Sequence, residues 1–400
     1  MKKLVHLTFI FIVLTGHKIL HTYRAVVISP VTDLLLRPMS ELKFLYKNGY
    51  SYEYMPIYGD IEACRRAHQL RANDLVEVLD ERDDEVQVSI FSCFYITRNN
   101  AEPHQKYWMR KKDLIPLQTL TNNNTPQSCI PKPITLHEPI PNAAILTKPW
   151  YDRTSKMLFS AGTRFALDHS DKRHHYIFVF NPAKQTYTIT SCPRAYCRIH
   201  YAQSLKEKRS QMIDLARSWT QNYHGFIPYA WGGCSIVKRM HYHRVSEYTL
   251  ETTDGKKYSY YQWSGKNYSP KTGIDCSGLI LLAAQSVGIP YFCKNSDTVE
   301  TTLLPVSAEN PLEEGDIIWT KGHVMLVADL KRHTLIEARG YGHGYGKVQE
   351  IPLSEHFKGI NTYQDLLACY EYNKPVIRLD KDGNVTGDPV PIKLFKIAME

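Results

Sequence analysis

The sequence predicts a multidomain fold in which two small β-barrels precede a larger α+β domain. Three observations support this prediction: a length of 400 residues, two blocks of short alternating segments, and a helical pattern followed by strand-like runs. Because a domain typically has about 100 to 200 residues, this chain is too long for one core. Its 43% hydrophobic residues, 22 prolines, 21 glycines and 27 tyrosines are typical of a globular protein rich in strands and turns.

Residues 1–24 have the pattern of an export signal peptide or an N-terminal anchor. Two lysines precede an apolar run from Leu4 to Leu14, which is too short to span a bilayer but suits the core of a signal peptide. No A-x-A cleavage site follows, so an uncleaved anchor remains an alternative. We therefore expect an exported protein of the periplasm or cell envelope, with no stable membrane span unless this segment is retained.

Two strand-rich blocks follow, at residues 25–118 and 145–203. The first contains AVVISPV, NDLVEVLDE, VQVSIFSCFYIT and KYWMRKKDLIPL, and the second contains TRFALDHS, HYIFVFN and TYTITS. Short alternating segments bounded by turn residues are typical of a small barrel. Residues 119–144 lack periodicity and are rich in Asn, Thr and Pro, which predicts a linker between the two barrels.

The pattern changes at residue 204, where a third domain is expected to begin and to extend to residue 375. LKEKRSQMIDLARSWTQNY has apolar residues at helical spacing, and TGIDCSGLILLAAQ predicts a second helix. DIIWTKG, HVMLVADL, HTLIEARG, KVQEIPL and LLACYEY then follow as strand-like runs. A helix followed by an antiparallel meander predicts an α+β layout. Residues 376–400 are interpreted as a loosely attached tail.

The charge and the cysteines bear on partners and cofactors. The net charge of +9 is scattered along the chain, so we expect no nucleic-acid partner, whereas an acidic polymer of the cell wall fits this balance. The nine cysteines form no C-x-x-C pair and no cluster with zinc spacing, so we expect no metal and no organic cofactor. Cys192 and Cys197 are close enough in the chain to pair locally.

Cys276 is the candidate nucleophile. It follows Asp275 at the predicted start of an apolar helix, where unpaired backbone N–H groups and the helix dipole stabilise a thiolate. This position alone does not distinguish a nucleophile from an inert buried thiol. A neighbouring base is therefore required.

His323 is the candidate base among 17 histidines. It opens the strand HVMLVADL on the same face as Met325 and Val327, and packing of this strand on the cysteine helix would direct the imidazole to the helix N-terminus. If the next strand forms a hairpin that turns near Leu330, Glu337 lies opposite His323. We therefore expect Glu337 to be the third catalytic group, which orients the imidazole.

Two other histidines are weaker candidates for the third group. His333 would lie about 13 Å along the strand from the site, at roughly 3.3 Å per residue, which is too far. His343, in the glycine-rich loop YGHGYG, remains a minor alternative because this loop could fold back.

The motifs PYAWGG, GIDCSG, GDIIW, GHVMLV and LIEA occur in this order. With them, residues 204–375 resemble the NlpC/P60 family of cell-wall cysteine peptidases, which implies a papain-like fold. The two preceding barrels resemble bacterial SH3 domains, an architecture similar to that of γ-D-glutamyl-L-diamino acid endopeptidases, or dipeptidyl-peptidase VI. The resemblance implies that Cys276 is the nucleophile and His323 the base. Glu337 stands where the family usually has a histidine, which is a departure from its pattern.

The resemblance also implies a pocket that binds the free N-terminal alanine of a stem peptide. Its residues would come from beside the nucleophile, from PYAWGG and from the first barrel: Asp275, Ser277, Tyr229, Ser296, Asp74 and Tyr107. Acidic and hydroxyl groups would together pair the buried ammonium. Two of these residues have simpler alternative roles, since Asp275 could only cap the helix and Asp74 could only occupy a turn.

These implications predict a thiol peptidase that cleaves the γ-D-glutamyl bond to the diamino acid in peptidoglycan stem peptides or muropeptide fragments. Two alternatives remain: a catalytically inert peptidoglycan-binding protein, or an acyltransferase or amidase of the same fold. The insertion at residues 235–270, between PYAWGG and GIDCSG, departs from the family spacing. It could restrict access to the site, contact glycan or form a surface loop.

Overall fold

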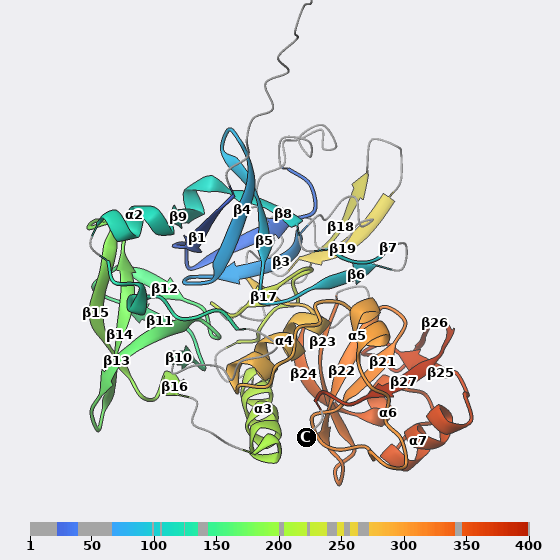
Figure 1. Ribbon diagram of the computed structural model, residues 1–400. Helices are drawn as coiled ribbons and strands as arrows, with labels where there is room; N and C mark the ends of the chain where they lie inside the picture. Colours follow the sequence, from blue (N-terminus) through green and yellow to red (C-terminus); the bar gives the residue numbers. More distant parts are fainter. Residues whose placement is uncertain are drawn as a thin grey trace, which may run out of the picture.

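Antiparallel sheets dominate the computed structural model of the protein, and helices are few (Figure 1). The structure describes residues 22–38, 66–97, 100–104, 106–123, 125–134, 143–199, 204–221, 225–237, 246–251, 257–262, 272–340 and 346–398. Residues 1–21 of the predicted export segment, His343 and most of the insertion at 235–270 lie outside this part. Within the described ranges, no helix has the length and apolar character needed to cross a membrane.

The first sheet corresponds to the block predicted at residues 25–118. Its described strands, in chain order, are β1 (Tyr23–Val27), β2 (Val31–Leu35), β3 (Arg66–Arg71), β4 (Leu75–Arg82), β5 (Glu85–Ile90), β8 (Lys106–Arg110) and β9 (Leu114–Pro116). They pair in the order β3-β2-β8-β5-β4-β1-β9. Alternation along β4 places Val76 and Val78 in the core and the intervening side chains nearer solvent. The outer strands β3 and β9 do not pair in the described part, so the expected closed barrel is not found there.

The start of the first sheet overlaps the predicted export segment. Tyr23, the first residue of β1, pairs with Val78 of β4. A segment removed up to residue 24 would therefore take the first two residues of β1 with it.

The segment predicted as a linker packs against both N-terminal sheets. It contains helix α2 (Leu117–Asn122) and the 3₁₀ turn η3 (Gln127–Cys129). Leu120 is buried in one cluster with Val26 of the first sheet and Tyr187 of the second. The few apolar side chains among the polar residues therefore have partners on both sides, which a search for periodicity does not detect.

The second sheet corresponds to the block predicted at residues 145–203. Its strands are β10 (Ala143–Leu146), β13 (Arg164–Ser170), β14 (His174–Asn181), β15 (Thr186–Pro193) and β16 (Cys197–Ile199), beside the hairpin of β11 (Trp150–Asp152) and β12 (Met157–Phe159). They pair in the order β15-β14-β13-β10-β16. Cys192 and Cys197 lie together in its core, where the hydrogen bond of Cys197 with Cys192 and then burial raise the pKa of Cys197.

The C-terminal domain packs two helices against a five-stranded sheet of order β24-β23-β22-β21-β27. Helix α3 (Leu205–Thr220) begins at Ser204, which forms a capping box with Glu207. Helix α4 (Cys276–Ser286) is apolar on nearly all sides and is buried between α3 and the sheet. The sheet strands are β21 (Ile317–Thr320), β22 (His323–Asp329), β23 (Thr334–Arg339), β24 (Lys347–Pro352) and β27 (Ile392–Phe395).

The remaining described elements are short. They are β6 (Tyr95–Thr97), β7 (Asn100–His104), η2 (Lys111–Asp113), β17 (Cys234–Ser235), β18 (Ser246–Glu251), β19 (Lys257–Gln262), β20 (Gly273–Ile274), α5 (Ser296–Thr302), α6 (Leu353–His356), α7 (Tyr363–Glu371), β25 (Val376–Leu379) and β26 (Val385–Val390). β18 and β19 form a hairpin within the insertion. The run LLACYEY, interpreted as a strand, belongs instead to helix α7, because Thr362 and Asp365 form a capping box before it.

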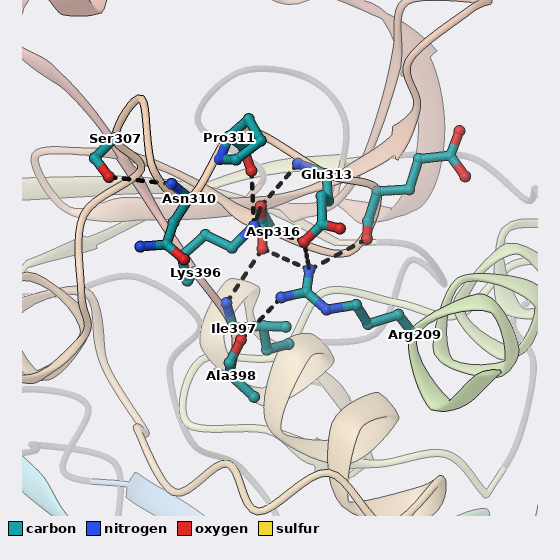
Figure 2. Close-up of polar contacts among 10 residues, drawn as sticks. Arg209, Ser307, Asn310, Pro311, Glu313, Asp316, Lys396, Ile397 and Ala398 are labelled. Atoms are coloured by element: carbon teal, nitrogen blue, oxygen red, sulfur yellow. Dashed lines mark hydrogen bonds and ion pairs between the residues drawn. The ribbon is translucent and has the colours of Figure 1, made fainter. Parts of the chain in front are cut away.

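The C-terminal segment is an integral part of the sheet, and the prediction of a loosely attached tail was wrong. β27 pairs with β21, and its Leu394 is fully buried. Figure 2 shows the polar cluster that holds this strand: Asp316 accepts hydrogen bonds from Arg209 at 2.6 Å and from Lys396 at 2.7 Å. Arg209 also donates to the carbonyl of Ala398 at 2.9 Å. The segment PIKLF is too short for its alternation to reveal a strand, so only pairing with β21 defines it.

Candidate active site

Cys276 is the first residue of α4, and its neighbours shape the start of this helix. Asp275 is the N-cap, and its carboxylate accepts a hydrogen bond from the backbone N–H of Gly278 at 2.5 Å. A side chain at Gly278 would overlap the carbonyl oxygen of Gly233, so the motif DCSG requires glycine at this position. The thiol of Cys276, itself half-buried, therefore lies at the positive end of a buried helix.

His323 contacts both Cys276 and Glu337. Its Nε2 lies 2.7 Å from Oε2 of Glu337, which leaves Nδ1 for the hydrogen bond with Cys276. Burial lowers the pKa of His323, but the hydrogen bonds and charges of Cys276 and Glu337 outweigh it and raise the pKa from 6.5 to about 9. The site therefore favours a protonated imidazole beside the sulfur, which is the charge state of a thiolate–imidazolium pair.

The strand pairing that brings His323 to Glu337 differs from the expected one. Leu326 pairs with Ile336, and continuing this register places Arg339, not Glu337, directly opposite His323. Glu337 is the diagonal neighbour, two residues along the strand, and a long side chain bridges this distance. The register differs because the hairpin turn is centred beyond Leu330, with Asp329 and Thr334 paired across it.

The face of β22 that packs on the cysteine helix was also assigned wrongly. Val324 and Leu326 share a core cluster with α4, whereas Met325 and Val327 belong to the cluster that also contains α7. His323 reaches Cys276 because it is the first residue of the strand, directly after Gly322, which lines the same pocket as the thiol.

Glu337 is fully buried and joins several side chains of the site. Its Oε1 accepts hydrogen bonds from Gln349 at 2.9 Å and from Nδ1 of His356 at 3.2 Å. Although burial would raise the pKa of Glu337, the charges and hydrogen bonds of His356 and His323 hold it well below 4.5. Arg339 adds a guanidinium 4.0 Å from the same oxygen. The carboxylate is therefore charged and multiply bonded, as a buried anion requires.

His356 is a residue of the site that the sequence did not reveal. It comes from the short helix α6, is fully buried, and its ring is parallel to that of His323 with centroids 5.9 Å apart. Burial lowers its pKa from 6.5 to about 4, so this imidazole is neutral at pH 7 and can donate to Glu337. No motif marks it, because it lies 19 residues beyond Glu337 in a different element.

A small cavity of about 80 Å³ adjoins the thiol and lies between the first sheet and the C-terminal domain. Its lining residues are Leu36, Arg66, Ala67, Tyr95, Tyr229, Trp231, Gly232, Asp275, Cys276, Ser277, Lys294, Asn295, Ser296 and Gly322. Gly232 has φ +67° and approaches the backbone of Arg66, which leaves no space for a side chain. Arg66 in turn donates to the carbonyl of Trp231 at 2.7 Å. The WGG motif thus serves the contact between the two domains.

The segment that follows β5 forms another wall of this cavity. Phe94 bridges to Cys293, and Asn295 donates to the carbonyl of Ile96 at 2.8 Å. These contacts place Tyr95 in the cavity, where burial, the first cause, raises the pKa of its hydroxyl. Tyr95 and Asn295 were not expected at the site, because neither lies in a recognised motif.

Asp275 does not present a free carboxylate to the cavity. Its Oδ2 lies 2.7 Å from the ammonium of Lys294, whose side chain is 1% exposed. Ser277 donates to Asp275 at 3.1 Å and also to the carbonyl of Lys294. The two residues predicted to bind a substrate ammonium are therefore already engaged with an ammonium of the protein itself.

The other predicted binding residues are divided between the cavity and the first sheet. Tyr229 and Ser296 line the cavity. Tyr107 is 1% exposed and lies behind Tyr95 in the core. Asp74 occupies the turn between β3 and β4, lines a different cavity, and accepts a hydrogen bond from the backbone N–H of Arg71 at 2.8 Å. The structure therefore does not bring Asp74 to the site of Cys276.

No group of three or more His, Cys, Asp or Glu side chains suited to a metal ion occurs in the described part of the chain. The contacts of the site are those of an acid–base and nucleophile pair with an orienting carboxylate.

Comparison with known proteins identifies the fold. No protein-family model matches the sequence, and no curated protein does. The structure is similar to the crystal structure of an NlpC/P60 family protein from Bacillus cereus ATCC 10987, with a TM-score of 0.50, 17% identity, and coverage of 82% of this chain and 94% of that one. Two proteins of Trichomonas vaginalis, NlpC2 and NlpC1, share 12% identity with the chain, with TM-scores of 0.31 and 0.30 and coverage of 94% and 84% of this chain, 98% and 89% of theirs. The chain therefore shares the fold of an NlpC/P60 family protein.

Proposed function

We propose that this protein is a cysteine peptidase of the NlpC/P60 type that cleaves the γ-D-glutamyl bond to the diamino acid in peptidoglycan stem peptides. One observation carries the proposal: His323 contacts both the thiol of Cys276 at a helix N-terminus and the buried carboxylate of Glu337. Among ordinary structural arrangements, a half-buried cysteine at a helix start, bonded to a histidine of raised pKa, is uncommon. This combination is what a thiol nucleophile needs.

The reaction follows from these contacts. The Cys276 thiolate attacks the carbonyl carbon, and backbone N–H groups at the start of α4 stabilise the oxyanion. The C–N bond then breaks as protonated His323 gives its proton to the leaving amine. Water next attacks the thioester while His323 accepts a proton, which releases the γ-D-glutamyl product and restores the thiol. Glu337 remains charged throughout and holds the imidazole in place.

The substrate proposal concerns a fragment with a free N-terminal L-alanine. Its support is the wall that Arg66 of the first sheet and Tyr95 of β6 add to the cavity beside Cys276. The substrate proposal does not depend on Asp74 or on a free carboxylate at Asp275. Assignment of the two N-terminal sheets as SH3-like domains, and of the chain as an exported protein, also remains part of this proposal.

The test uses purified protein, reduced, with L-Ala-γ-D-Glu-diaminopimelate and the same peptide acetylated at its N-terminus. Mass spectrometry follows the cleavage of both peptides. We expect the free peptide to be cleaved and the acetylated one to be cleaved at a rate at least about tenfold lower. Cys276→Ala should abolish cleavage while retaining the circular dichroism spectrum. Cys293→Ala, which removes another thiol near the site, is the matched control.

Other outcomes point to the alternative functions. Retained cleavage in Cys276→Ala would sink the mechanism. If neither peptide is cleaved and Cys276 is alkylated slowly at neutral pH, an inert binding protein is favoured. Failure with rapid alkylation would favour an acyltransferase or amidase, although the cavity of about 80 Å³ is small for a long acyl chain.

A further inference from the structure

A second cavity, of about 20 Å³, lies away from Cys276 where four segments meet. The end of β3 and the turn after it contribute Arg71, Asn73 and Asp74, and the segment after β5 contributes Phe91 and Ser92. Strand β13 contributes Arg164, and the segment after η3 contributes its prolines and Ile134. Two guanidinium groups therefore line one small space.

These guanidinium groups are almost completely buried and hold unused donors. Arg164 is 7% exposed, and its Nε and Nη2 have no hydrogen-bond partner. Arg71 is 3% exposed, and its Nε is likewise unpartnered, although its Nη1 donates to the carbonyl of Cys234 at 3.2 Å. Buried donors of this kind are ordinarily satisfied, so three together call for an acceptor.

The surrounding residues supply little negative charge. Asp74 is the acidic residue of the cavity lining, and its Oδ2 already accepts the backbone N–H of Arg71 at 2.8 Å. Two guanidinium groups and one carboxylate leave one positive charge in excess. The remaining lining residues, which include Ser92, Pro131 and Pro133, are uncharged, so they do not balance this charge.

The supporting contacts show a built site. Asn73 donates to the carbonyl of Arg164 at 2.8 Å and accepts from the hydroxyl of Tyr187 at 2.8 Å. These bonds hold the turn after β3 against β13 and β15. The two arginines are therefore positioned by the contact between the N-terminal sheets and not by their own ion pairs.

We infer that this cavity binds a small monovalent anion, of the size of chloride, between Arg71 and Arg164. Its volume of about 20 Å³ admits one such ion or one water but no larger oxyanion. The anion accepts the unused N–H groups, balances the excess charge and joins the first sheet, the second sheet and the connecting segment. This site is independent of the chemistry at Cys276.

Bromide identifies the site directly, because it replaces chloride and scatters anomalously. Crystals of the full chain grown in sodium bromide should show an anomalous peak between the guanidinium groups of Arg71 and Arg164. Arg164→Met should lose this peak, whereas Arg153→Met, at an exposed arginine in the turn between β11 and β12, should keep it. A wild-type map without a peak there, with a water in its place, overturns the inference, and a peak that persists in Arg164→Met means an adventitious ion only.

A solution measurement covers the case in which Arg164→Met does not fold. Replacing sodium gluconate by sodium chloride at equal ionic strength should raise the wild-type Tm by about 2 °C or more, with saturation. Asp74→Asn removes the competing carboxylate but retains an acceptor for the N–H of Arg71, so its half-saturating chloride concentration should fall several-fold. A half-saturating chloride concentration that is unchanged or higher in this variant also contradicts the inference. So does a wild-type Tm that does not saturate with chloride.

Discussion

Nε2 of His323 lies 2.7 Å from Oε2 of Glu337, a carboxylate that solvent does not reach. A histidine in this position pairs with a full negative charge, whereas a neutral third residue would offer only a dipole. A carboxylate as the third group therefore has a definite electrostatic consequence. It favours the imidazolium form of His323 and increases the range of pH over which the proton is retained.

The first prediction tests this charge. Glu337→Gln should lower the pKa of His323 below its value of about 9. Since His323 must be protonated to release the amine, the upper limb of the kcat/KM profile should move to lower pH, and kcat/KM at pH 7 should fall about 10- to 100-fold. Glu350→Gln, on the neighbouring strand β24, is the control and should leave the limb in place. An unshifted limb in Glu337→Gln would mean that Glu337 does not set the charge of His323.

The second prediction concerns the neutral His356. Its pKa in the folded protein is about 4, below 6.5, so between these values the unfolded chain binds more protons than the folded one. The contribution of His356 to stability is therefore present above about pH 6.5 and is lost as the pH falls to about 4. His356→Gln should remove up to about 3 kcal/mol of this pH dependence.

The measurement is urea unfolding from pH 4 to 7. The difference in slope between His356→Gln and the wild type isolates this residue from the carboxylates that titrate in the same range. His169→Gln, at an exposed histidine of the second sheet, should behave as the wild type. Parallel curves for His356→Gln and the wild type would show that His356 is not held neutral by burial.

The third prediction addresses the pair of Asp275 and Lys294. Lys294→Met leaves a nearly buried carboxylate without its partner and should lower the free energy of unfolding by about 3–5 kcal/mol. Adding Asp275→Asn removes the charge and retains a helix cap, so the double variant should recover most of this loss. Chemical denaturation of the wild type, the two single variants and the double variant measures the coupling energy between the two side chains. A double variant no more stable than Lys294→Met would show that the two charges do not act as a pair.

The fourth prediction concerns the C-terminal strand. Lys396→Met removes a buried cation that donates to Asp316 and Glu313, both at 2.7 Å, and should cost about 3–5 kcal/mol. Lys393→Met, within the same strand β27, is the matched control: it breaks the half-exposed pair with Glu300 and the contact of the ammonium over the Trp319 ring, and should cost at most about 1 kcal/mol. Equal losses in thermal unfolding would contradict the network shown in Figure 2.

The local part of the site follows from the sequence. GIDCSG followed by an apolar stretch predicts a helix that begins at the cysteine, and α4 begins at Cys276. The strands of His323 and Glu337 are also predicted, because alternation and turn residues are properties of neighbouring positions. Their contact was expected from an approximate register, and a diagonal pair of long side chains tolerates an error of two residues.

Tertiary structure alone determined the rest. Lys294 pairs with Asp275, and His356 forms a hydrogen bond with Glu337. Both come from segments without a recognisable pattern, and each lies 19 residues from its partner in the sequence. Asp74, which the resemblance implied as a binding residue, lies at another cavity, and residues after 375 complete the main sheet through pairing with β21. A sequence pattern records the period of one element, whereas the charge that a buried side chain meets depends on which distant elements pack around it.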